Sequence, residues 1–94
     1  MAWMQQHPSI QLLGRAIRTR REQAGWTQEE FAGRVDFDRA YYSHIERGGI
    51  NISLLVFFRI AAGLDCQPGE LMPDKSALTD LPPPSRTRGR RQSP

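Results

Sequence analysis

The feature that most constrains this chain is a repeated signal for the start of a helix. Thr27 and Glu30 have the spacing of a capping box, and Trp26 and Phe31 are placed to form a hydrophobic staple around it. Staples of the same spacing surround three further predicted helix starts, at Asp38, Ser53 and Gln67. Because capping and staple signals agree at these positions, they predict several short helices whose starts lie close together in the sequence.

Apolar residues at helical spacing extend these starts into a full set of helices. The first helix is expected to begin at a Ser9 cap, to run to about Ala24 and to end before Gly25, a residue type favoured just after a helix. The predicted helices cover about residues 9–24, 28–35, 38–47, 53–63 and 68–72. We therefore predict an all-α fold, a compact bundle of five helices.

The chain is expected to divide into three parts. Residues 1–8 lack apolar periodicity and are interpreted as a flexible arm, and residues 9–73 as the helical domain. Residues 74–94 are rich in proline and arginine and cannot bury enough apolar surface to fold, so we expect a disordered tail. The tail is open to two interpretations, a solubilising end or a basic arm that follows phosphates.

Composition limits the kinds of site that the chain can build. Of its 94 residues one is cysteine, which cannot form an internal disulfide, and the two histidines lie far apart in sequence. We therefore expect no metal, no cofactor and no enzymatic activity. No apolar run approaches the roughly 20 residues that cross a bilayer. The first residues also lack a secretion signal, so the expected location is cytoplasmic, without membrane contact.

The segment 37–48 carries the strongest functional signal. In the expected helix 38–47, Tyr42 and Ile45 fall on one face at helical spacing. The other face presents donors and small side chains, at Arg39, Ala40, Ser43 and His44. A helix that reads base edges needs this division into a buried and an exposed face. With the preceding helix, the segment is interpreted as a helix-turn-helix whose second helix enters the major groove of double-stranded DNA.

Taken together, these residues resemble the lambda-repressor-like, Cro-type (XRE) helix-turn-helix family. The matching pieces follow family order and spacing over about residues 9–72. They are Leu13-Gly14-x-x-Ile17-Arg18-x-x-Arg21, Gly25-Trp26-Thr27-Gln28-Glu29-Glu30-Phe31-Ala32, Tyr42-Ser43-x-Ile45-Glu46-Arg47-Gly48, Asn51-x-Ser53-Leu54, Arg59-Ile60-Ala61, Leu64 and Pro68-x-Glu70-Leu71. The resemblance implies a lambda-repressor-like five-helix bundle that binds specific DNA sequences, usually as a dimer.

The resemblance also implies roles for individual residues. Positions that face bases are matched by Arg39, Ala40, Ser43 and His44. Positions near phosphates are matched by Gln28, Tyr41, Arg47 and Asn51. Arg21 and Glu46 match an ion pair that ties the first helix to the end of the recognition helix. For Arg39 two interpretations stay open, a bidentate contact with guanine or a contact with a phosphate.

The helix 53–63 is apolar almost all round, which is unusual for a short helix on a small domain. We expect Leu54 to lie in the core. That leaves Leu55, Val56 and Phe58 as an apolar surface for a second copy of the chain or for another protein.

Two functions follow from these features. The first is a sequence-specific DNA-binding transcriptional regulator, a repressor or small controller protein, that inserts helix 38–47 into an inverted-repeat operator as a homodimer. The alternative is an antitoxin-type interaction module, which would bind a partner protein through the apolar surface. In that case the same helix-turn-helix would serve to regulate its own gene.

Overall fold

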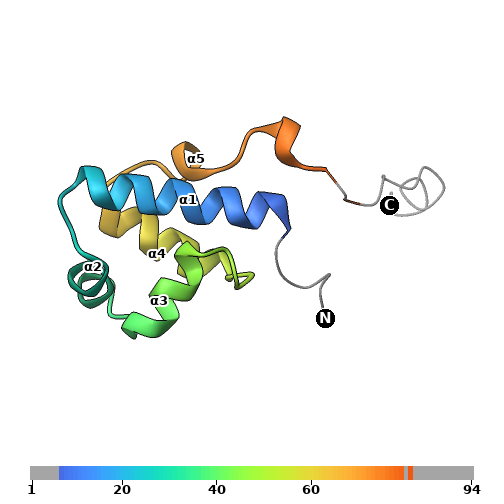
Figure 1. Ribbon diagram of the computed structural model, residues 1–94. Helices are drawn as coiled ribbons and strands as arrows, with labels where there is room; N and C mark the ends of the chain where they lie inside the picture. The colour runs from blue at the N-terminus through green and yellow to red at the C-terminus, as the bar shows by residue number, and fades with distance from the viewer. Residues whose placement is uncertain (1–6, 80, 82–94) are drawn as a thin grey trace, which may run out of the picture.

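The computed structural model describes residues 7–79 and 81, and within them all regular elements are helical (Figure 1). The elements are α1 (Pro8–Gln23), α2 (Gln28–Arg34), α3 (Arg39–Glu46), α4 (Leu54–Leu64), α5 (Pro68–Leu71) and a short 3-10 helix, η2 (Lys75–Ala77). The predicted all-α fold with five α-helices is therefore confirmed. In this part of the chain no helix is long and apolar enough to cross a membrane.

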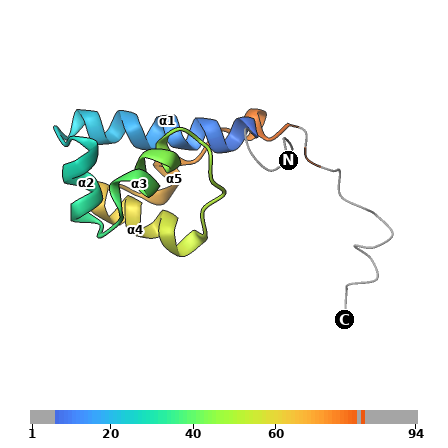
Figure 2. The same cartoon turned by 60° about the horizontal axis from the view of Figure 1, so that its bottom comes forward.

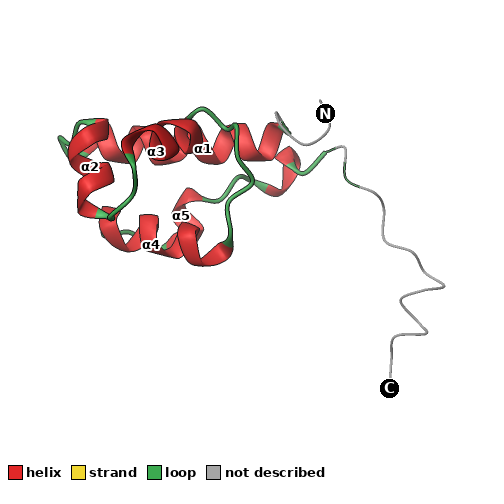
Figure 3. Cartoon of the chain, turned by 90° about the horizontal axis from the view of Figure 1, so that it is seen from below, coloured by secondary structure: helices red, strands yellow, loops and turns green. Residues whose placement is uncertain are grey.

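The helices enclose one apolar centre. Helix α1 packs against α3, α4 and α5, and α2 packs against α3. Figures 2 and 3 show α1 and α4 along opposite sides of the bundle, with α2 at one end. The core consists of ten buried apolar side chains, Ile17, Phe31, Ala32, Val35, Tyr42, Ile45, Phe57, Ile60, Ala61 and Leu71.

The predicted helix starts of α2, α3 and α4 are confirmed by their hydrogen bonds. Thr27 Oγ1 accepts from the Glu30 backbone N–H at 3.0 Å, and the Glu30 carboxylate accepts from the Thr27 N–H at 2.9 Å, which completes the capping box. The Asp38 carboxylate accepts from two backbone N–H groups of the first turn of α3. The Ser53 hydroxyl caps α4 by accepting from the Val56 backbone N–H. These caps fix where each helix of the motif begins.

The start of α1 differs from the prediction. The helix begins at Pro8, and its cap is His7, whose Nδ1 accepts from the Ser9 backbone N–H at 3.1 Å. The proline suits the first helical position because its fixed φ is already helical and it has no N–H to satisfy. Ser9 is therefore inside the helix and is not its cap. At α5, Gln67 makes no side-chain capping bond.

The described residues after Met72 turn back toward the start of α1. Asp74 caps η2, and Thr79 accepts at its backbone oxygen from His7 Nε2 at 2.9 Å. One turn of helix thus lies beyond the predicted domain boundary near residue 74. Of the expected flexible arm 1–8, Pro8 lies in α1 and residues 1–6 lie outside the residues that the structure describes, as do residues 80 and 82–94 of the expected disordered tail 74–94.

Candidate nucleic-acid interface

A buried polar network holds α3 against α1 and α2. Arg21 Nε donates to Glu46 Oε2 at 2.7 Å, and Arg21 Nη2 donates to Glu46 Oε1 at 3.1 Å. The Tyr42 hydroxyl donates to the same carboxylate, and the Gln28 side-chain amide donates to it at 2.9 Å. Since Arg21 and Glu46 are 7% and 6% exposed, the network fixes the orientation of α3 from inside the domain.

The protonation states of this network follow from its geometry. Burial opposes the charge on Glu46, but hydrogen bonds from Arg21, Tyr42 and Gln28 outweigh it and hold the pKa of the carboxyl below its usual range. The hydrogen bond to Glu46 raises the pKa of Arg21. Burial, together with Glu46, raises the pKa of Tyr42, so the phenol stays a donor. The network therefore contains one anion, one cation and two neutral donors.

The outer face of α3 carries a shallow hollow lined by Arg39, Ala40, Ser43 and Arg47. All four were predicted to contact DNA, and the structure places them side by side. Arg39 is exposed. Within the described part of the chain its guanidinium makes no hydrogen bond or ion pair, so all of its donors are available to a ligand.

Arg47 contacts two neighbouring side chains on this face of α3. Its guanidinium donates to Ser43 Oγ at 3.0 Å and lies 3.1 Å from His44 Nδ1. The His44 ring in turn lies against Gly49, where an added β-carbon would come within 2.5 Å of the ring. The end of α3 therefore carries an exposed positive group that is joined to two neighbouring side chains of the same helix.

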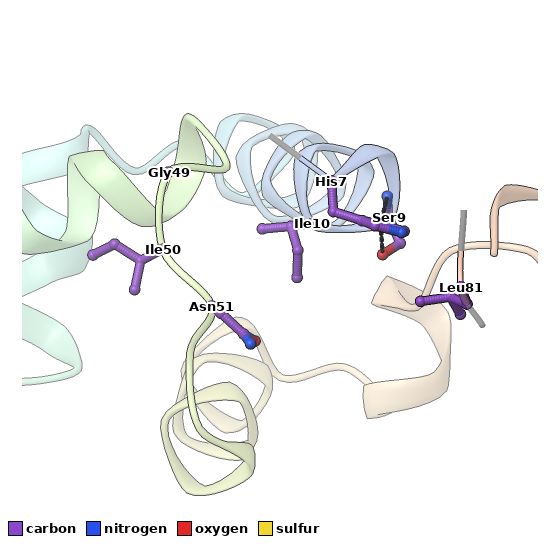
Figure 4. A pocket seen from close by; sticks show the side chains of 7 residues that line it. All are labelled: His7, Ser9, Ile10, Gly49, Ile50, Asn51 and Leu81. Carbon is purple, nitrogen blue, oxygen red and sulfur yellow. Dashed lines mark hydrogen bonds between the residues drawn. The ribbon is translucent and has the colours of Figure 1, made fainter. Parts of the chain in front are cut away.

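The remaining predicted phosphate residues are arranged differently. The Gln28 side-chain amide donates inward to Glu46, and two backbone N–H groups at the start of α2 are engaged by the capping box of Thr27 and Glu30. Tyr41 is half-buried and packs edge to face against Phe37, with ring centroids 5.4 Å apart. Asn51 lies apart from the α3 hollow, in a second hollow that it shares with the start of α1 and with Leu81 (Figure 4).

Comparison with known proteins decides the family. A helix-turn-helix family model matches residues 17–71, more than half of the chain. The chain belongs to the helix-turn-helix family. It is a DNA-binding regulator of transcription, and α2 and α3 are the two helices of its motif.

Relatives of this helix-turn-helix protein include a control protein and an antitoxin. It is 46% identical over 55 residues to the control protein C.MunI from Mycoplasma sp., across 58% of this chain and 74% of the relative. It is 32% identical over 74 residues to the antitoxin HipB from Escherichia coli O6:H1, across 73% of this chain and 79% of the relative.

Two solved structures of similar proteins superpose on this fold. The restriction-modification controller protein C.AhdI from Aeromonas hydrophila superposes with a TM-score of 0.65 at 35% identity. The match covers 67% of this chain and 96% of that chain. NHTF from Neisseria, described as a hypothetical transcription factor, superposes with a TM-score of 0.67 at 32% identity, across 72% of this chain and 78% of that chain.

The helix-turn-helix protein also exposes an apolar surface on α4. Leu55 is 80% exposed and Phe58 is 45% exposed, and with Val56 and Arg59 they line a hollow. Val56 is half-buried and packs against the core, so it contributes only an edge. The prediction for Leu54 was wrong, because this side chain is 63% exposed and extends the apolar surface to the start of α4.

Two further residues beside this interface, Phe37 and Arg59, were given no role in binding from the sequence. Phe37 packs against Tyr41, and Arg59 lies over the Phe37 ring at 5.1 Å from its centroid. Phe37 stands at the staple position before Asp38, and Arg59 belongs to the family piece Arg59-Ile60-Ala61. No local signal indicated their contact, because Arg59 lies in α4 and Phe37 in the turn between α2 and α3.

Proposed function

We propose that this regulator reads an inverted-repeat operator through α3, as a homodimer of the restriction-modification controller type. The observation that carries the proposal is the α3 hollow, where Arg39, Ala40, Ser43 and Arg47 gather on a helix held in place by a buried ion pair. The 46% identity to C.MunI and the near-complete coverage of C.AhdI support the controller type in particular.

Arg39 is the main base reader in this proposal. Its unengaged guanidinium at the start of α3 can donate two parallel bonds to guanine O6 and N7, which is worth about 1–3 kcal/mol of discrimination. Ala40 allows the helix to approach closely and can contact a thymine methyl group. Ser43 and His44 line the next turn, where contacts with bases or phosphates complete the readout.

Phosphate contacts set the position of α3 in the groove. We assign these contacts to Tyr41 and Arg47, in α3 and at its end, to Asn51 in the segment before α4, and to the backbone N–H of Gln28 at the start of α2. Contacts of this kind position the protein on the duplex without reading its sequence. The basic tail adds a further, salt-sensitive attraction as an arm that follows the backbone.

Dimerisation uses the apolar surface of α4. Two copies joined there by Leu55 and Phe58, with the edge of Val56, would present two recognition helices to successive major grooves, about 34 Å apart. Such a protein works in the cytoplasm, without enzymatic activity and without a cofactor.

A second function is favoured by one observation, the match to HipB over 79% of that antitoxin's length. In this alternative the α4 surface binds a partner protein of different sequence. DNA binding through α3 then regulates the protein's own gene. The operator contacts are the same in both cases, so the occupant of the α4 surface distinguishes them.

The proposal is tested by selecting bound duplexes from a random pool at one salt concentration, with the mass of the free protein measured in parallel. An enriched inverted repeat and the mass of a dimer are the expected results. Enrichment by a protein that stays monomeric until a second protein is added would favour the antitoxin type. No enrichment by a folded protein would reject sequence-specific reading.

A further inference from the structure

Three side chains from three segments form a continuous contact from α4 to the DNA-facing side of α3. The Arg59 guanidinium of α4 lies over the ring of Phe37, which belongs to the turn between α2 and α3, with 5.1 Å to the ring centroid. The Phe37 ring meets the Tyr41 ring edge to face, with centroids 5.4 Å apart and planes at 86°. Arg59 itself lines the hollow of the α4 surface.

This arrangement determines where the Tyr41 phenol is held. No hydrogen bond of the described residues engages the Tyr41 hydroxyl, so packing alone sets the direction of its ring. Phe37 supplies the aromatic part of that packing, and a cation over an aromatic face is attracted by the ring quadrupole. Phe37 and Tyr41 also pack against the core, so loss of Arg59 would remove the contact on one side of the Phe37 ring and leave the Tyr41 ring less firmly held.

We propose that Arg59 is a positioning residue for DNA binding, which acts through Phe37 on the Tyr41 hydroxyl. The inference rests on the proposed function, in which Tyr41 donates to a phosphate. In this proposal Arg59 affects DNA affinity only when the Tyr41 hydroxyl is present. Its role is therefore different from a direct charge attraction to DNA and from a contact in the α4 surface. It also gives the α4 surface a direct physical connection to the DNA interface.

The test is a double-mutant cycle with Arg59→Gln and Tyr41→Phe, measured by titrating the enriched duplex at fixed salt. Arg59→Gln should lower the affinity about two- to fivefold in the wild-type background, the scale of one exposed cation–π contact. In the Tyr41→Phe background the same substitution should have almost no effect. Arg59→Lys keeps a cation over the ring and should restore most of the affinity.

Two further measurements separate positioning from other roles. The ring proton resonances of Tyr41 should shift in Arg59→Gln, because the orientation of the neighbouring Phe37 ring changes. Phe37→Leu removes the aromatic ring between Arg59 and Tyr41 and leaves every side chain that lines the α4 hollow in place. Its effect on DNA affinity should also disappear when Tyr41 is phenylalanine. Melting temperatures and the mass of each variant at the assay concentration show that fold and assembly are retained.

Equal losses in both Tyr41 backgrounds would overturn the inference, because Arg59 would then act on DNA through its charge alone. Unshifted Tyr41 resonances in Arg59→Gln would overturn it as well. Either outcome leaves the proposed function intact, provided that the wild-type protein still selects its duplex. If the wild-type protein showed no preferred duplex, the proposed function itself would be rejected.

Discussion

Arg21 and Glu46 join α1 to the last turn of α3 through two parallel N–H···O bonds of 2.7 and 3.1 Å. Glu46 belongs to the DNA-facing helix itself, but its side chain and that of Arg21 are almost completely shielded from water. The contribution of the pair is therefore to the stability and orientation of α3, and base preference depends on it only indirectly.

Replacement of the buried anion should destabilise the domain strongly. Glu46→Ala leaves the Arg21 charge buried without its partner, which costs about 3–5 kcal/mol of unfolding free energy. Urea denaturation measures this loss. The matched control is Glu70→Ala, which removes a carboxylate from the exposed Arg20–Glu70 pair and should cost less than about 1 kcal/mol. Similar losses in the two variants would contradict the account of the network.

The same carboxylate should make stability depend on pH. The folded-state pKa of Glu46 lies below the ordinary value of 4.5, so its contribution is fully present above that value and is lost as the pH falls through the lower, folded-state pKa. Glu46→Gln should therefore show a shallower loss of stability in acid than the wild type. Denaturation midpoints between pH 6 and pH 3 would test this, and parallel pH curves would argue against a charged Glu46.

The crossing of α1 and α3 should tolerate no side chain at Gly14. A β-carbon there would lie 2.8 Å from the Ile45 backbone oxygen, and also against the Glu46 oxygen, so the two helices would have to separate. Gly14→Ala should cost about 1–3 kcal/mol of stability, as for other overpacked sites. It should also weaken DNA binding, because α3 is displaced.

Gly33→Ala is the control for that substitution. An added β-carbon at Gly33 of α2 meets no atom within 4 Å, so alanine should stabilise the helix by roughly 0.5–1 kcal/mol. If thermal melting gave Gly14→Ala the same sign as Gly33→Ala, the close crossing would not exist in solution.

The apolar surface of α4 should hold the dimer together. Leu55→Asp places a charge on a side chain that is 80% exposed in one copy, so folding should be unaffected while the dimer dissociation constant rises about tenfold or more. Sedimentation equilibrium gives the constant. Leu78→Asp changes a leucine that is 48% exposed elsewhere and should leave the mass unchanged. A Leu55→Asp protein that remained fully dimeric would place the interface on another surface.

The starts of the motif helices could be predicted because their signals are local. The capping box of Thr27 and Glu30 and the Asp38 cap depend on residues within three positions of each other, and the structure contains both. The cap of α1 could not be read in this way. Histidine is an uncommon N-cap, and Pro8 is as consistent with the end of an arm as with the first residue of a helix.

Tertiary contacts explain what the sequence left undetermined. Gln28 was placed near a phosphate, but nothing local indicates that its amide turns inward to Glu46, 18 positions later. Leu54 was assigned to the core from helical spacing, whereas it is the first residue of α4 and is 63% exposed. The contact between Arg59 and Phe37 likewise depends on how α4 packs beside the turn of the motif.

We propose that α3 reads DNA sequence through Arg39. Duplex selection with the wild type and Arg39→Ala at one salt concentration tests this proposal most directly. The wild type should enrich an inverted repeat. Arg39→Ala should keep the repeat and its spacing but lose the preference for one guanine in each half-site, with discrimination there reduced by about 1–3 kcal/mol. An unchanged base profile, with affinity lowered equally for all duplexes, would instead make Arg39 a phosphate contact and contradict the account.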